Sequence, residues 1–241
     1  MRCGWGRVAG LVLGIGYVLG CASAAHAQYY ERETYESPSE RFLYAGAQSL
    51  TFAPRPSNPV GDSLAIRFTR LAGILGFRQG LVDILFGYSR YDQHGITRPA
   101  IFLGTTVATE LSVAGKPGNA LLLPFLIAAD FMRAEASGLS RDNFNVASLG
   151  LGTGLTYRLR SPGMEFSTSA TAAAQYSFEG FSSSSGSSIV LMGEAVVHLN
   201  DVMVAGGIVL GYRIRFEQWS MSGDRDDYHA LSHGPFLGVL F

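Results

Sequence analysis

The last eleven residues of the chain, 231–241, read LSHGPFLGVLF. Successive side chains of a β-strand point in opposite directions, so alternate residues share a face. One face carries Leu231, His233, Pro235, Leu237, Val239 and Phe241, and the other carries Ser232, Gly234, Phe236, Gly238 and Leu240. The alternation predicts a final strand that presents an apolar face and ends in an aromatic residue.

A closing strand of this kind resembles that of bacterial outer-membrane β-barrels, the superfamily of small porin-like barrels with eight to ten strands. The resemblance implies that Leu237, Val239 and Phe241 form a C-terminal assembly signal. It also implies partners: the barrel-assembly machinery and periplasmic chaperones during biogenesis, and outer-membrane lipid and lipopolysaccharide around the finished barrel. No nucleic-acid partner is expected, because 18 basic residues are balanced by 19 acidic ones.

The N-terminus predicts export. Arg2 and Arg7 precede an apolar run over 8–19, and Ala25-His26-Ala27 is a small-residue cleavage pattern. We therefore expect a signal peptide over 1–27, a periplasmic segment over 28–40 and a barrel over 41–241. An alternative is cleavage before Cys21, because Val18-Leu19-Gly20-Cys21 resembles a lipoprotein box and would leave a lipidated cysteine.

Hydropathy favours a membrane protein without spanning helices. The mean hydropathy is +0.19, yet beyond the leader no apolar run reaches the roughly 18 to 20 residues that a membrane-spanning helix needs. Backbone polar groups in lipid must be satisfied within the protein, which leaves the closed barrel as the remaining architecture. Thirty glycines and 28 aromatic residues (15 Phe, 11 Tyr and 2 Trp) suit that fold.

Alternating segments predict an all-β fold, a closed antiparallel up-and-down transmembrane β-barrel. The expected strands lie within 42–52, 64–68, 82–88, 101–111, 121–131, 149–159, 166–178, 189–199, 202–216 and 231–241. Short turns are expected near 74–80, 114–119, 160–163 and 200–201, and longer links at 54–61, 91–99, 134–143, 179–188 and 217–229. Because 42–52 alternates poorly, an eight-stranded barrel is the alternative to ten. Pro124 predicts a bulge in its own strand.

The aromatic residues are expected to form two girdles. The outer one would hold Tyr88, Tyr91, Phe131, Phe144, Tyr176, Phe178, Phe216, Trp219 and Tyr228, and the inner one Tyr44, Tyr157, Phe166 and Phe241. Such girdles suit the two bilayer interfaces. They favour a barrel over the alternative of a soluble β-sandwich.

The face opposite the apolar one carries charges of both signs. The positions predicted to face the lumen include Arg67, Asp83, Glu110, Asp130, Arg158, Glu165, Glu194, Arg213 and Arg215. Buried charges are costly unless they are paired, so we expect a charge network in which Arg158 lies opposite Glu165. The predicted function is therefore an occluded barrel with a structural or envelope-interaction role, and a narrow pore for small solutes is the alternative.

Catalysis, cofactors and metals are not expected. Asp227-Tyr228-His229 is similar to the acid and histidine that omptin proteases carry near the outer rim, and Asp92 and His94 occupy another outer link, but no Asp-x-Asp pair lies on a facing strand. An omptin-like protease is thus a less favoured alternative. Ser232 and His233 are adjacent, so they point to opposite faces and form no hydrolase pair.

Overall fold

The computed structural model describes residues 41–55, 65–116, 118–136, 143–179, 184–203, 206–222 and 227–241. The predicted signal peptide over 1–27, the segment over 28–40 and the possible lipidation of Cys21 lie outside these residues. Within them, no helix is long and apolar enough to cross a membrane.

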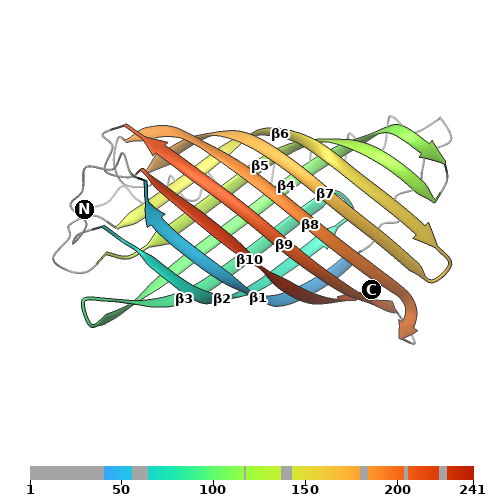
Figure 1. Ribbon diagram of the computed structural model, residues 1–241, viewed down its shortest axis with the longest axis horizontal. Helices are drawn as coiled ribbons and strands as arrows, with labels where there is room; N and C mark the ends of the chain where they lie inside the picture. The colour runs from blue at the N-terminus through green and yellow to red at the C-terminus, as the bar shows by residue number, and fades with distance from the viewer. Residues whose placement is uncertain are drawn as a thin grey trace, which may run out of the picture. The chain divides into compact units, whose positions relative to one another are not determined.

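Ten strands form one antiparallel sheet that closes on itself (Figure 1). The strands are β1 Arg41–Pro54, β2 Phe68–Gln79, β3 Val82–Gln93, β4 Ile96–Lys116, β5 Asn119–Ala134, β6 Phe144–Ser161, β7 Met164–Glu179, β8 Ser185–Met203, β9 Gly206–Met221 and β10 Tyr228–Leu240. Each strand pairs with its neighbours in the chain, and β1 pairs with β10 from Phe42 opposite Leu240 to Pro54 opposite Tyr228. The ten-stranded barrel is confirmed, and the eight-stranded alternative is wrong.

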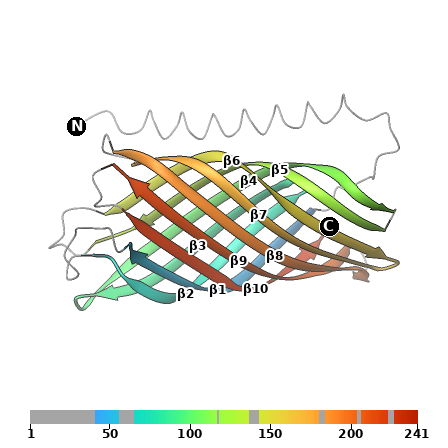
Figure 2. The same ribbon diagram turned by 45° about the horizontal axis from the view of Figure 1, so that its top comes forward.

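Successive strands run in opposite directions between the two ends of the barrel (Figure 2). At one end, here called the turn end, β2, β4, β6 and β8 end and β3, β5, β7 and β9 begin. The same end holds Arg41 and Phe241, whose backbone groups meet in a 3.0 Å hydrogen bond. At the other end, the loop end, β3 meets β4 at 94–95, β1, β5, β7 and β9 end, and β2, β6, β8 and β10 begin. Because the strands alternate in direction, β1 begins and β10 ends at the same end of the barrel, the turn end.

The structure of β1 explains why the sequence of 42–52 alternates poorly between apolar and polar residues. Phe42, Tyr44, Leu50 and Phe52 are buried inside the barrel, whereas Leu43 between them is exposed on the outside. In the other strands the larger apolar side chains face outward more often. The pattern of 42–52 was therefore unclear because this strand turns its aromatic face to the interior.

Strand β2 lies later in the sequence than predicted. The expected strand at 64–68 and turn at 74–80 are wrong, because β2 runs to Gln79 and the turn contains only Gly80 and Leu81. Glycines within the strand gave the false turn signal. Gly76 faces the ring of Tyr44 so closely that a side chain there would overlap it, which shows that this glycine makes room rather than ending a strand.

Several other boundaries also differ. The predicted long link at 91–99 is a tight hairpin, in which His94 and Gly95 both have positive φ (52° and 75°), as a two-residue type I′ turn requires. The turn expected at 200–201 comes later, because β8 continues to Met203. The bulge attributed to Pro124 lies in the neighbouring strand, between Ser112 and Ala114 of β4. Proline lacks an N–H, and the β5–β6 ladder omits Leu123 and Pro124.

Candidate functional site

Five side chains form a network across the middle of the barrel, here called the central ion group. Arg213 Nη2 lies 2.7 Å from Asp83 Oδ2 and 2.5 Å from Glu194 Oε2. Arg78 contacts the same carboxylates, at 3.0 Å from Asp83 and 2.7 Å from Glu194. Tyr44 donates to Asp83 (2.8 Å) and accepts from Arg213 (3.1 Å). Two guanidinium groups thus balance two carboxylates, and all their contacts lie within the lumen.

The strand order shows that this network crosses the interior of the barrel. Arg213 belongs to β9 and Asp83 to β3, and β10, β1 and β2 lie between those strands in the wall. The ion pair therefore spans the interior. Arg213 is only 2% exposed. Its charge is therefore stabilised by the carboxylates of Asp83 and Glu194, because little water can solvate it.

A second network, the Arg215 group, connects β9 to β5, β7 and β8. Arg215 Nη2 lies 2.6 Å from Asp130 Oδ1 and 2.9 Å from Glu217 Oε2. Gln175 donates to Asp130 (2.6 Å), and Ser188 donates to Gln175 (2.8 Å). In this group, two carboxylates share one guanidinium.

A third network, the Arg158 group, ties β4, β6 and β7 together nearer the turn end. Arg158 lies 3.1 Å from both Glu110 and Glu165, and Arg160 lies 2.5 Å from Glu165. The expected contact between Arg158 and Glu165 is present, but the register differs from the prediction. Arg160 is directly opposite Glu165, and Arg158 reaches it diagonally, because the turn holds only Pro162 and Gly163.

Eight of the nine charged residues predicted for the lumen belong to these three groups. Arg67 does not fit the prediction, because it is exposed just before β2, between the buried Ile66 and Phe68. The sequence reasoning also missed Arg78 and Arg160, which it assigned to turns. Arg78 and Arg160 each lie two residues from an inward-facing residue of the same strand. If the predicted strands had extended far enough to include them, both side chains would have been assigned to the lumen.

Six aromatic side chains pack together in the interior near the loop end, and we call them the aromatic plug. They are Phe52, Phe68, Tyr91, Phe144, Trp219 and Tyr228, all buried. Phe52 stacks on Tyr228 at 4.8 Å and Phe68 stacks on Tyr91 at 4.1 Å, measured between ring centroids. Phe144 meets Trp219 edge to face at 5.1 Å. These contacts have the geometries that aromatic rings favour.

The aromatic plug corrects the predicted girdles. Tyr91, Phe144, Trp219 and Tyr228 point into the barrel instead of out of it, as does Tyr44 near the turn end. Tyr176 does face outward, where it is 61% exposed. The prediction grouped residues by their height along the barrel and overlooked that alternate residues face inward.

The turn end is filled by a separate apolar cluster. Its buried members are Phe42, Tyr44, Ile74, Leu85, Val196, Val209, Phe236 and Leu240. Along β9 the inward residues pass from Val209 through Arg213, Arg215 and Glu217 to Trp219. Along this strand the inward side chains are thus apolar near both ends and charged between them.

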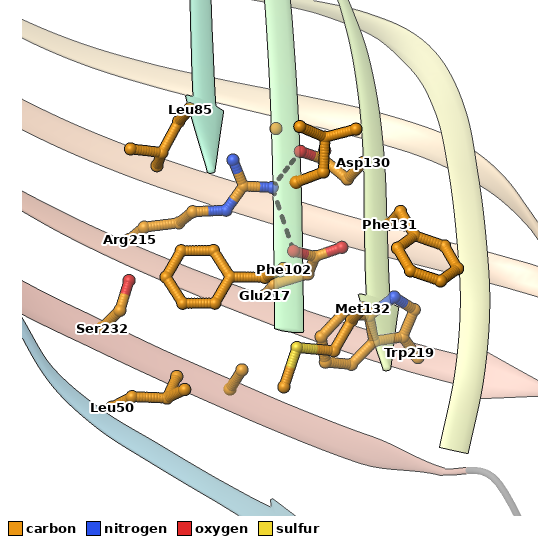
Figure 3. Close-up of a pocket in the computed structure, with 13 residues that line it drawn as sticks. Leu50, Leu85, Phe102, Asp130, Phe131, Met132, Arg215, Glu217, Trp219 and Ser232 are labelled. Atoms are coloured by element: carbon orange, nitrogen blue, oxygen red, sulfur yellow. Dashed lines mark hydrogen bonds and ion pairs between the residues drawn. The ribbon is translucent and has the colours of Figure 1, made fainter. Parts of the chain in front are cut away.

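A small cavity lies beside the Arg215 group (Figure 3). Its volume is about 30 Å³, and its polar lining includes Asp130, Arg215, Glu217 and Ser232. Phe102 and Trp219 form part of its apolar wall. By this measure a single water needs roughly 10–15 Å³, so the cavity has room for about two small occupants.

The residues considered for catalysis have separate local roles. Asp227 accepts a 2.8 Å hydrogen bond from the backbone N–H of Met221 and lies 3.7 Å from Arg55, which braces the loop end. His229 packs outside the barrel against Phe216. Asp92 accepts from Thr97 at 2.7 Å, and His94 forms the hairpin after β3.

Ser232 and His233 also point apart. Ser232 lines the interior cavity, and His233 meets the Tyr212 hydroxyl outside the barrel at 2.8 Å. In the described parts of the chain, no group of three or more His, Cys, Asp or Glu side chains is arranged to hold a metal ion.

The C-terminal residues predicted as an assembly signal share the outer surface. Leu237, Val239 and Phe241 are all exposed, and they alternate with the inward Phe236, Gly238 and Leu240. Their side chains therefore contribute little to the packed interior and remain accessible.

No protein-family model matches the chain, and no curated protein sequence matches it. Solved structures that resemble it include outer-membrane β-barrel proteins. The outer membrane protease OmpT of Escherichia coli is 9% identical with a TM-score of 0.35, and the match covers 87% of this chain and 99% of that one. Neisserial surface protein A is 13% identical with a TM-score of 0.31, covering 83% and 97%.

The transport unit of the autotransporter AIDA-I of Escherichia coli is 10% identical with a TM-score of 0.33, and the match covers 94% of this chain and 98% of that one. The ten-stranded barrel of this chain is established independently by its own closed ladder of paired strands.

Proposed function

We propose that this chain is an integral β-barrel protein of the bacterial outer membrane, with an occluded lumen and a structural or envelope-interaction role. The supporting observation is the apolar outer surface of the barrel, to which all ten strands contribute. Exposed large apolar residues include Leu43, Leu71, Phe86, Leu103, Phe125, Leu151, Tyr176, Leu191, Leu210 and Leu237, one on each strand in order.

Such a surface is unfavourable in water. Soluble monomers rarely expose a contiguous apolar patch larger than a few hundred Å², whereas here apolar side chains surround the whole barrel. Lipid removes that cost. A closed ladder also satisfies the backbone groups that hydrocarbon cannot. The outer membrane is the bilayer in which a bacterial barrel of this kind resides, and the predicted leader over 1–27 supports export to it.

The interior supports a structural role over transport. The apolar cluster of the turn end, the central ion group and the aromatic plug follow one another along the lumen, so a solute would meet three filled layers. A catalytic role has no comparable support, because Asp227 is engaged by Arg55 and Met221 while His229 faces outward. The partners we propose are the surrounding lipid and lipopolysaccharide and, during biogenesis, the assembly machinery.

Heat-modifiable gel migration tests the proposal. The protein recovered from outer membranes should run as a compact species in SDS when unheated and shift to its full apparent mass after boiling. A version that begins at residue 28 should require detergent or lipid to stay monomeric. A detergent-free monomer in buffer with an intact sheet, judged by circular dichroism and sedimentation, would contradict the proposal.

A further inference from the structure

The Arg215 group differs from the other two networks in its charge balance. The central ion group has two guanidinium groups and two carboxylates, and so does the Arg158 group. In the Arg215 group, Asp130 and Glu217 share Arg215 alone. One negative charge is left over inside the barrel. Burying an uncompensated charge is expensive, so a further positive charge is expected at this site.

The carboxylate of Glu217 identifies where that charge belongs. Its Oε2 accepts from Arg215 at 2.9 Å, but its Oε1 is buried and has no hydrogen-bond partner. Glu217 is only 6% exposed, and it lines the cavity beside Arg215 (Figure 3). A buried carboxylate oxygen without a partner beside a cavity indicates an occupant that can satisfy it.

A second buried group borders the same cavity. The indole Nε1 of Trp219 has no hydrogen-bond partner, and the residue is 1% exposed. A water molecule can accept from this N–H, donate to Glu217 and direct its other lone pair at a cation. Phe102 and Trp219 add aromatic rings to the wall, and such rings attract cations that lie within about 6 Å of a ring face.

We propose that this cavity binds one small monovalent cation, such as Na⁺ or K⁺, together with one water molecule. The volume of about 30 Å³ suits two occupants of that size. A single positive charge cancels the excess of the group, whereas a divalent ion would reverse it. The inference concerns the folded barrel and does not depend on which membrane surrounds it.

Glycine at position 104 keeps the site open. A Cβ atom there would lie 3.1 Å from Asp130 Oδ1 and 3.4 Å from Arg215 Nη1, tighter than ordinary contact. Any larger side chain would push into the ion pair and the space beside it. Gly104→Val is therefore a variant that should weaken cation binding while leaving every charge in place.

Trp219 provides a direct readout. The chain has two tryptophans, Trp5 and Trp219, so the full-length Trp5→Phe protein reports on this cavity alone. We would titrate the folded protein in detergent micelles with thallium(I), a heavy monovalent cation that quenches indole fluorescence. Ionic strength would be held constant with the N-methylglucamine salt, whose cation is too large for the cavity. We expect saturable quenching that K⁺ reverses by competition.

Glu217→Gln should abolish the saturable component, because it removes the excess charge. Glu110→Gln is the matched control: it makes the same change in the Arg158 group and should keep the saturation curve, even if the barrel is less stable. Linear, non-saturable quenching of the parent protein would overturn the proposal and leave a proton or water alone as the occupant. Saturation that survives in Glu217→Gln would also overturn it, because the cation would then bind elsewhere.

Discussion

Arg213 on β9 and Asp83 on β3 form an ion pair across the interior of the barrel, with Nη2 2.7 Å from Oδ2. Arg213 also holds Glu194 of the adjacent β8, so one side chain links both sides of the lumen. The central ion group thus connects strands from opposite sides of the barrel wall.

Removing Arg213 should therefore destabilise the barrel strongly. Arg213→Met leaves Asp83 and Glu194 with Arg78 as the one remaining cation of the central ion group, and breaking a buried pair from one side costs about 3–5 kcal/mol. Urea unfolding in detergent micelles would measure the loss. The control is Arg133→Met, whose ion pair with Glu135 is partly exposed and should contribute less than about 1 kcal/mol. Equal effects of the two changes would show that the central ion group is unimportant.

The aromatic plug should contribute through packing. Phe144 contacts the rings of Phe52, Trp219 and Tyr228 at 5.0–5.1 Å between centroids. Phe144→Ala should lower the free energy of unfolding by about 3–5 kcal/mol, because it leaves a cavity in a packed cluster. Tyr176→Ala on the outside serves as the control and should cost clearly less in the same urea titration. A larger effect at Tyr176 would mean that the rings at the loop end pack loosely.

Conductance should require the loss of more than one layer. The aromatic plug and the central ion group lie in series, so Phe144→Ala alone should remain closed in planar bilayers, as should the parent protein. A variant that combines Phe144→Ala and Arg213→Ala with Phe236→Ala in the turn-end cluster removes bulk from all three layers and should show measurable ion flow. Steady channels from the unmodified protein would favour the narrow-pore alternative.

Strand periodicity predicted the closed barrel and most of the interior charges, because in a strand the face of one residue fixes the faces of its neighbours. The prediction failed where a glycine within a strand makes room for a neighbouring side chain. Gly76 read as a turn residue, yet it accommodates the ring of Tyr44, and the error hid Arg78. The aromatic plug was missed because a tyrosine or tryptophan near a strand end suits either a membrane interface or a packed interior, and only the exact register distinguishes them.

A charge placed in the outer apolar band should be costly in lipid. Leu151 on β6 is 70% exposed on the outside, and Leu151→Arg should destabilise the barrel by about 2–4 kcal/mol in bilayers if this position lies near the midplane. Ser187→Arg, on the outside of β8 near the loop end, is the control and should cost about 0–1 kcal/mol. Unfolding titrations in phospholipid vesicles measure both, and equal costs would argue against lipid around the barrel.

A substitution at Phe241 should impair assembly into the membrane without changing the stability of the folded barrel. Phe241 is 61% exposed, and its backbone N–H, not its ring, bonds to Arg41. Phe241→Ala should therefore change the free energy of unfolding, measured by urea titration of the refolded protein, by no more than about 0.5 kcal/mol, as is typical of surface positions. The amount of heat-modifiable protein in the outer membrane of expressing cells should nevertheless fall. Leu43→Ala, an exposed apolar position at the same end, is the matched control and should assemble normally. If Phe241→Ala assembles as well as Leu43→Ala, the ring is not an assembly signal; if it assembles poorly and also refolds poorly, its role is structural instead.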